Sequence, residues 1–254
     1  MARTAESFIK NEDVPAVIKE RVRLHGVYIS PGNRKLGKIP NFSLRPGLDC
    51  PGKTPLCTKF CYAKQAFSYS NDCKVNWSVN GQQANNKFLL DRAGHDIIRW
   101  LYEKKPALFR IHVAGDFVSM SYSRMWEEVA AEFPKTQFLA FTKVFDNSIL
   151  FKPYFGNNVN IIWSVWPDTD FSKIPPGPRA YCDMSELGYE YPESERERLS
   201  KALRCEGACE SCGICFHSND NQVDVVMKAH GPSVSNIIRS KTMKRDSKGR
   251  FVSG

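Results

Sequence analysis

Nine cysteines are unevenly spread along this chain of 254 residues, and four of them form one tight run. Three, two and two residues separate the thiols of this run, which are Cys205, Cys209, Cys212 and Cys215. Structural zinc sites usually take two short pairs that a longer arm separates, whereas an unbroken run is typical of a loop around a [4Fe–4S] cluster. The spacing therefore favours iron–sulfur ligation, with zinc as the alternative.

A second group holds three cysteines with six and three residues between them: Cys50, Cys57 and Cys61. Three thiolates on a four-iron cluster leave one iron without a protein ligand, and that iron can bind a small molecule. Catalytic zinc keeps an open position in the same way. The alternative is a zinc site that Cys73 or a histidine completes. The pattern gives no role to Cys182.

The chemistry of these thiols depends on the compartment. No run of apolar residues is long enough to cross a membrane, and the first residues are polar and lack the apolar core of a secretory signal. We therefore expect a cytoplasmic protein without membrane contact. Because cytosolic thiols stay reduced, metal binding is favoured over disulfide formation.

The charge is unevenly placed. The net charge is +9, and residues 239–254 contribute six basic side chains and one acidic one. Such a tail can bind nucleic acid by contacting its phosphates, and it can equally be a solvated, flexible end. Both interpretations stay open at this point.

Apolar periodicity predicts the elements that must position the cysteines. Residues spaced by about four predict helices over 89–101 and 122–133. Strands are expected over 108–114, 137–142, 159–166, 180–184 and 223–229, while the Gly-, Pro- and Cys-rich stretch 31–63 is expected to be a structured loop without a helix or a strand pair. The alternation of strand and helix predicts an α/β fold with a mostly parallel sheet.

Polar residues follow three of the expected strands directly. They are Gly115-Asp116, Thr142-Lys143 and Trp166-Pro167-Asp168. Ligands of parallel sheets bind at the carboxyl ends of the strands, so these turns are candidates for cofactor contacts, with ordinary solvated turns as the alternative. Among the histidines, His112 is expected on the polar side of its strand as a core residue or a substrate contact, and His217 is a candidate extra ligand of the second cluster.

The residues around the first cysteines also carry a resemblance to a known family. Segments 33–44 (NRKLGKIPNFSL) and 46–52 (PGLDCPG), the following Cys57 and Cys61, and segment 109–117 (FRIHVAGDF) resemble the gene product 88 family of phages and plasmids. The strand end at Thr142-Lys143 and segment 205–216 fit the same family. The resemblance covers roughly residues 30 to 230 and implies a phage or plasmid origin, with action in the host cytoplasm.

A more distant resemblance links the three-cysteine group, which ends in Cys-Tyr, to radical S-adenosylmethionine enzymes. It implies a partial (βα) barrel in which Cys50, Cys57 and Cys61 hold a [4Fe–4S] cluster. It also implies that Gly115 and Asp116 orient S-adenosylmethionine, which a reduced cluster cleaves to methionine and a 5′-deoxyadenosyl radical. The spacing of six and three residues in this chain differs from the usual three and two of those enzymes.

Together these observations predict an iron–sulfur protein with one or two [4Fe–4S] clusters, resembling a radical S-adenosylmethionine enzyme and acting with an electron donor on an unknown substrate. Gly115, Asp116, Thr142 and Lys143 are the expected cofactor-binding residues. The alternative is a zinc-stabilised nucleic-acid-binding protein. The expected organisation is an α/β domain over 1–200 with the cluster loop at 50–63, a small cysteine-cluster module with a last strand over 201–230, and a flexible basic tail over 231–254.

Overall fold

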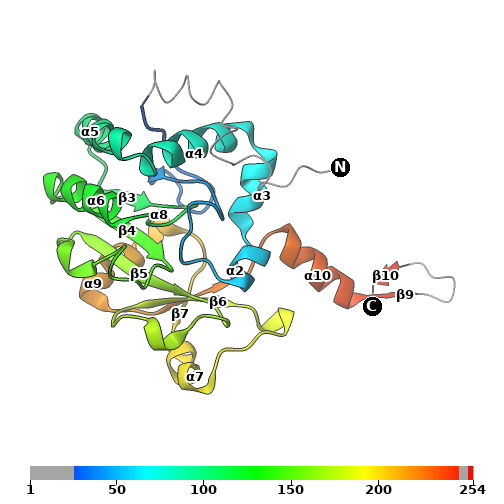
Figure 1. The fold of residues 1–254 in the computed structure, drawn as a ribbon. Helices are drawn as coiled ribbons and strands as arrows, with labels where there is room; N and C mark the ends of the chain where they lie inside the picture. The colour runs from blue at the N-terminus through cyan, green and yellow to red at the C-terminus, as the bar shows by residue number, and fades with distance from the viewer. Residues whose placement is uncertain (1–25, 246–250, 254) are drawn as a thin grey trace.

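The computed structural model describes residues 26–245 and 251–253. Its main feature is an eight-stranded sheet in the order β1-β2-β3-β4-β5-β6-β8-β7 (Figure 1). The strands are β1 (Ile29–Ser30), β2 (Asn41–Phe42), β3 (Leu108–Ile111), β4 (Gln137–Thr142), β5 (Val159–Val165), β6 (Arg179–Asp183), β7 (Leu203–Arg204) and β8 (Val225–Lys228). All neighbouring strands pair in parallel except β1 and β2, which are antiparallel.

The mostly parallel α/β architecture predicted from the sequence is confirmed. The sheet is open, with β1 and β7 at its two edges, so it does not close into a barrel, and the expected partial barrel is not confirmed. Strand β4 spans the predicted residues, whereas β3 ends earlier than expected, at Ile111.

Nine α-helices connect and cover the strands in the described residues: α2 (Pro55–Lys59), α3 (Tyr62–Tyr69), α4 (Asn71–Ala84), α5 (Lys87–Lys104), α6 (Met120–Glu132), α7 (Glu193–Ser200), α8 (Cys209–Cys212), α9 (Ser218–Asn221) and α10 (Pro232–Thr242). Helix α5 begins where the side chain of Asn86 accepts a hydrogen bond from the Phe88 amide, and it ends at Lys105 in a left-handed conformation. Pro106 follows and cannot continue the helix. None of the described helices has the length and apolarity that crossing a membrane requires.

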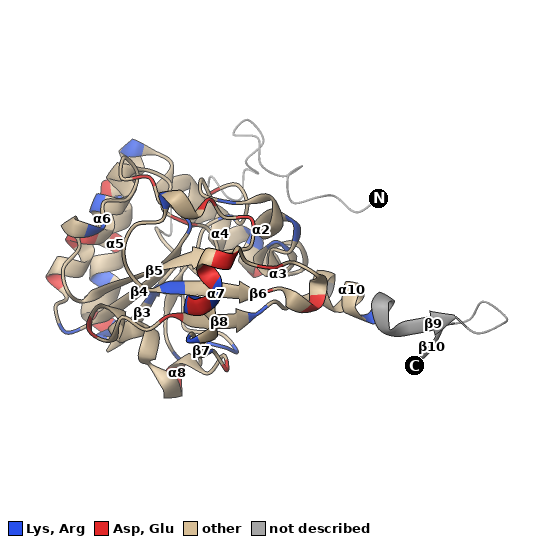
Figure 2. Ribbon diagram, turned by 90° about the horizontal axis from the view of Figure 1, so that it is seen from below, with Lys and Arg blue, Asp and Glu red and all other residues tan. Residues whose placement is uncertain are grey.

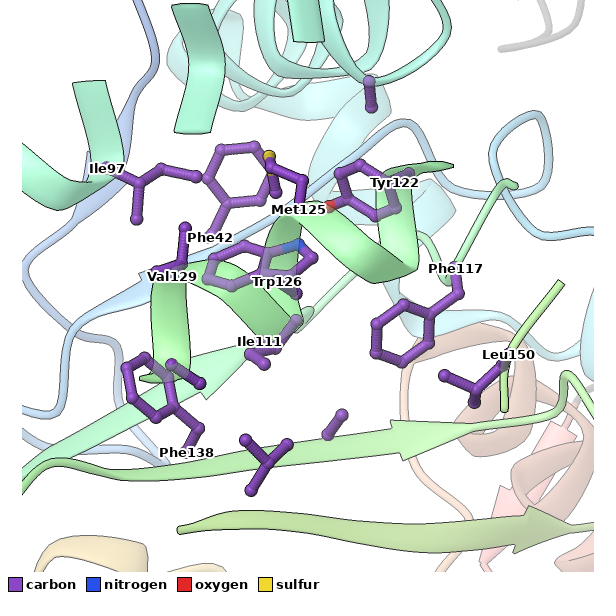
Figure 3. Packing of buried hydrophobic residues seen from close by; sticks show 14 of the residues in the cluster. Phe42, Ile97, Ile111, Phe117, Tyr122, Met125, Trp126, Val129, Phe138 and Leu150 are labelled. Atoms are coloured by element: carbon purple, nitrogen blue, oxygen red, sulfur yellow. The ribbon is translucent and has the colours of Figure 1, made fainter. Parts of the chain in front are cut away.

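The largest core lies between the sheet and helices α5 and α6, on what we call the helix face (Figure 3). Phe138 and Ala140 of β4 point into this core, together with Trp126 of α6 and Ile97 of α5. Because side chains alternate along a strand, Leu139 of β4 points to the opposite side of the sheet.

That opposite side, which we call the cysteine face, is covered by residues 36–39 and the 3₁₀-helix η6 (Ile214–His217). Phe216 of η6 is buried against Leu139 and Ile162, and Cys209 and Cys215 pack at the margin of the same cluster. The four-cysteine segment is thus part of the covering of the main sheet in the described residues. A separate C-terminal cysteine module is therefore not supported.

The structure differs from the sequence-based expectation in two further segments, both of which contain helices. The stretch 31–63 holds β2, helix α2 and the start of α3, although no helix was expected there. Helix α2 forms because Thr54 caps its first turn by accepting from the Cys57 amide and because Pro55 suits a first helical position. In the basic tail, residues 232–242 form α10, which projects from the body (Figures 1 and 2). Residues 246–250 and 254 lie outside the described residues.

Candidate functional site

A buried ion pair fixes the start of the three-cysteine loop. The Arg45 guanidinium donates from Nε and Nη2 to the two carboxylate oxygens of Asp49, at 2.7 Å each, and the side chains are only 3% and 2% exposed. Asn85 of the α4–α5 connection adds a donor to Asp49 at 2.9 Å. The backbone oxygen of Asp49 accepts from the Asp116 amide at 2.7 Å. The residue before Cys50 is therefore joined to the turn that follows β3.

Asp116 ties the ends of β3 and β4 together. Its Oδ1 accepts from the Thr142 hydroxyl at 2.6 Å and from the Phe117 amide at 2.8 Å, and its Oδ2 accepts from the Lys143 amide at 2.9 Å. Burial raises the pKa of Asp116, and these hydrogen bonds oppose that shift. Because its oxygens already accept from protein donors, Asp116 acts here as a residue that positions the two strand ends.

Gly115 is required by the same turn. Its φ is +82°, a region that favours glycine, and a Cβ there would lie 2.4 Å from Cβ of Leu44. The structure therefore brings together all four residues expected to contact a cofactor: Gly115, Asp116, Thr142 and Lys143.

Lys143 directs its side chain along the carboxyl edge of the sheet. Its ammonium donates to the Ser164 hydroxyl at 2.9 Å and lies 5.5 Å from the centre of the Trp166 ring. The cysteine loop packs directly on the backbone of this residue, since a Cβ on Gly52 would lie 2.1 Å from the Lys143 carbonyl oxygen. The third expected turn also meets the loop, because the Asp168 carboxylate accepts from the Leu56 amide of α2 at 2.8 Å.

The thiols of Cys50, Cys57 and Cys61 are free and lie at this edge. Burial, followed by the charge of Asp116, raises the pKa of Cys50 to about 12, and the other two thiols add to the same shift. Burial also raises the pKa of Cys57, while the Lys143 ammonium opposes it.

Within the described residues, no three Cys, His, Asp or Glu side chains are grouped tightly enough to hold one metal ion. A multi-iron cluster asks for a different arrangement, because each thiolate binds its own iron atom. The three thiols interact electrostatically at one sheet edge, but they do not form a ligand shell for a single ion.

The four-cysteine segment continues from β7, whose last residue precedes Cys205. The Cys209 amide donates to the carbonyl oxygen of Lys35 at 3.0 Å, which attaches α8 to the loop before β2. Burial raises the pKa of Cys215 to about 12, and the charge of Arg110 opposes this shift.

Arg110 is a site residue that sequence reasoning missed. It lies on β3 between Phe109 and Ile111, which both point into the helix-face core, so its guanidinium lies on the cysteine face over the Phe141 ring at 4.0 Å. Its charge acts on Cys205, Cys209 and Cys215 and on the Tyr62 hydroxyl. The alternation of side chains along β3 could have indicated that Arg110 lies on the face opposite Phe109 and Ile111. It could not have indicated that the four-cysteine segment covers this face.

Tyr62 and Cys182 bring the two cysteine groups into one neighbourhood. Tyr62 follows Cys61 and donates its hydroxyl to the Val113 carbonyl oxygen at 2.7 Å, next to Arg110. Cys182 on β6 interacts electrostatically with both Cys57 and Lys35, and Lys35 interacts with Cys205 and Cys209. The three-cysteine loop at the carboxyl edge and the four-cysteine run on the cysteine face are therefore neighbours.

His112 does not lie where the sequence placed it. Its φ is +64°, so the strand breaks off there and the side chain turns into the helix-face core instead of following the polar side. Its Nε2 pairs with the Tyr122 hydroxyl at 2.8 Å. Burial, followed by the nearby Arg110 charge, lowers the pKa of His112 to about 3. It is a hydrogen-bonded core histidine. His217, at the end of η6, is exposed.

Comparison with known proteins agrees with the family suggested by the sequence. The family model described as gene product 88 matches residues 23–165, which is more than half of the chain. The chain belongs to the gene product 88 family. The Gene 88 protein of Mycobacterium phage D29 is 29% identical over 207 residues, covering 73% of this chain and 86% of the relative.

The Gene 88 protein of Mycobacterium phage L5 is 27% identical over 210 residues, covering 75% of this chain and 88% of that relative. No solved structure matches the chain significantly. The region that defines gene product 88 includes the three-cysteine loop and both strand ends, Gly115-Asp116 and Thr142-Lys143. The four-cysteine segment lies beyond it.

Proposed function

We propose that this gene product 88 protein is an iron–sulfur protein with two clusters, and that it acts as a radical S-adenosylmethionine-type enzyme on a substrate still to be identified. The observation that carries the proposal is the position of the three-cysteine loop. It packs on the carboxyl ends of β3 and β4, beside Asp116 and Lys143, where parallel sheets bind their ligands.

The donor set fits such a cofactor. Soft thiolates select iron–sulfur clusters or zinc, and none of the seven grouped cysteines is engaged in a disulfide. Cys50, Cys57 and Cys61 would hold one cluster, and the run Cys205, Cys209, Cys212 and Cys215 the other. When bound, a reduced cluster supplies the electron that cleaves a sulfonium cofactor.

The chain supplies positioning and charge around that site. Asp116 fixes the ends of β3 and β4 relative to the cysteine loop. Gly115 lets the backbone of the turn pass close to Leu44. The Lys143 ammonium, oriented by Ser164, offers a positive charge to an anionic group of a bound cofactor, such as its carboxylate.

The metal is tested first. The protein is purified without oxygen, reconstituted with iron and sulfide, and analysed for iron, sulfide and visible absorption. Cys57→Ala should lose one cluster, and the double variant Cys209→Ala/Cys212→Ala should lose the other. Cys73→Ala on α4 is the matched control and should keep both. A protein that retains zinc and takes up no iron supports the zinc alternative instead, with nucleic-acid binding through the basic tail as its next test.

The cofactor is tested second, on protein with both clusters loaded. Addition of S-adenosylmethionine should change the electron paramagnetic resonance spectrum of the cluster at Cys50, Cys57 and Cys61. Lys143→Met should weaken this binding without lowering the iron content, because Lys143 contributes charge and no metal ligand. A loaded wild-type protein whose spectrum is unchanged by S-adenosylmethionine rules out the radical mechanism and leaves an iron–sulfur protein of another kind.

A further inference from the structure

Arg110 is an arginine inside the protein body that forms no ion pair with a carboxylate of the described residues. Its contacts are with neutral groups. Nε donates to the His112 carbonyl oxygen at 2.9 Å, and the guanidinium lies over the Phe141 ring at 4.0 Å. The residue that supplies this carbonyl oxygen, His112, has a left-handed backbone conformation.

Three other arginines of the body differ from Arg110 because they form ion pairs with carboxylates. The pairs are Arg45 with Asp49, Arg179 with Glu195, and Arg198 with Asp224. A cation removed from water is costly unless an anion compensates it. Arg110 is partly buried, so the absence of a carboxylate partner indicates that another anion belongs beside it.

The groups around Arg110 identify that anion. The Phe141 ring under its guanidinium packs against the same apolar cluster as Cys209 and Cys215, and the Arg110 charge acts on these two thiols and on Cys205. Lys35, whose carbonyl oxygen accepts from the Cys209 amide at 3.0 Å, also acts on Cys205 and Cys209. The acidic Glu210 of α8 is directed elsewhere, since its carboxylate accepts from the Lys38 amide at 3.1 Å.

We propose that Arg110, assisted by Lys35, is the counter-charge for the metal–thiolate site formed by the four-cysteine run and raises its reduction potential. This inference rests on the proposed function. Four thiolates give a bound metal centre a net negative charge, and one-electron reduction makes that charge more negative. A fixed cation beside the centre stabilises the reduced form more than the oxidised form, because net charge and surroundings set such potentials.

The counter-charge also affects how tightly the metal is retained. Groups outside the ligand shell that interact with the ligands typically change metal affinity by about 10–100-fold when they are removed. Arg110→Gln keeps a planar polar group but removes the charge, so it should release metal to a chelator about 10–100-fold more readily. Arg110→Lys should retain most of the effect.

The experiment uses the Cys57→Ala background, in which only the four-cysteine site is expected to carry a cluster. Its reduction potential is measured by redox titration with electron paramagnetic resonance, together with its iron content. Arg110→Gln should shift the potential to more negative values, and Lys35→Gln should shift it in the same direction by less. Arg99→Gln is the matched control, because Arg99 pairs with Asp96 on α5, and it should leave the potential unchanged.

The outcomes separate the two proposals. Loaded sites whose potential and metal retention are the same in Arg110→Gln and in its parent overturn the role of Arg110 and leave the proposed function intact. If Arg110→Gln does not fold, the Lys35→Gln shift and the Arg110→Lys variant decide. A parent protein whose four-cysteine run binds neither iron nor zinc overturns both proposals.

Discussion

The buried imidazole of His112 makes the stability of the protein depend on pH in a calculable way. Its pKa falls from 6.5 to about 3 in the folded protein, because burial and the charge of Arg110 disfavour the protonated form. Between these two values the unfolded chain binds a proton that the folded chain does not. The contribution of His112 to the free energy of unfolding is therefore fully present above pH 6.5. It is lost as the pH falls from 6.5 towards 3, by about 1.4 kcal/mol per pH unit.

From pH 7 to pH 5 the expected loss from this single residue is about 2 kcal/mol. The assay is urea unfolding of the reduced, metal-free protein at pH 7, 6 and 5. The comparison variant is His112→Asn, since asparagine tolerates the left-handed conformation and carries no titrating group. The variant should be less stable at pH 7, because the bond to Tyr122 is lost, but its stability should fall by about 2 kcal/mol less across the range. Parallel pH dependences in the two proteins would refute the assignment of His112 to the core.

Two further predictions concern the three-cysteine loop. Asp49→Ala leaves the Arg45 guanidinium buried without its partner and should lower the free energy of unfolding by about 3–5 kcal/mol in urea denaturation; a loss well under that range would mean that solvent reaches Arg45. Gly52→Ala places a Cβ 2.1 Å from the Lys143 carbonyl oxygen, so it should lower the free energy of unfolding in urea denaturation by about 1–3 kcal/mol. The same variant should take up less iron at the loop. Iron uptake equal to wild type would show that the loop moves away without losing its ligand geometry.

Local sequence patterns predicted much of the fold. Helix α5 and strand β4 could be predicted from the spacing of their apolar residues. Pro106 marks the end of α5, and the polar pair Thr142-Lys143 marks the end of β4. The two-residue strands β1, β2 and β7 escaped prediction, because so short a strand has no periodicity to detect and depends on its partner. Helix α2 escaped because glycine and proline dominate its surroundings and only the Thr54 cap marks its start.

The candidate site, like the fold, could be predicted from the sequence only in part. The meeting of Gly115-Asp116 with Thr142-Lys143 follows from neighbouring parallel strands, whose carboxyl ends share one edge. The proximity of Arg110 to the four-cysteine run does not follow from any local pattern, since more than ninety residues separate them in sequence. His112 was misplaced because strand alternation cannot foresee a single left-handed residue.

The order of strands in the sheet also constrains how the protein assembles. Strand β8 lies between β6 and β7, although β7 comes first in the chain. During synthesis from the N-terminus, β2 and β3 to β6 can pair once they have emerged, but β7 must wait for β8. Residues 205–215 lie between these two strands, so we expect the four-cysteine run to be among the last parts of the sheet to become ordered. Under the proposed function, metal supply at that moment then decides whether the segment closes around a metal centre or around bare thiols.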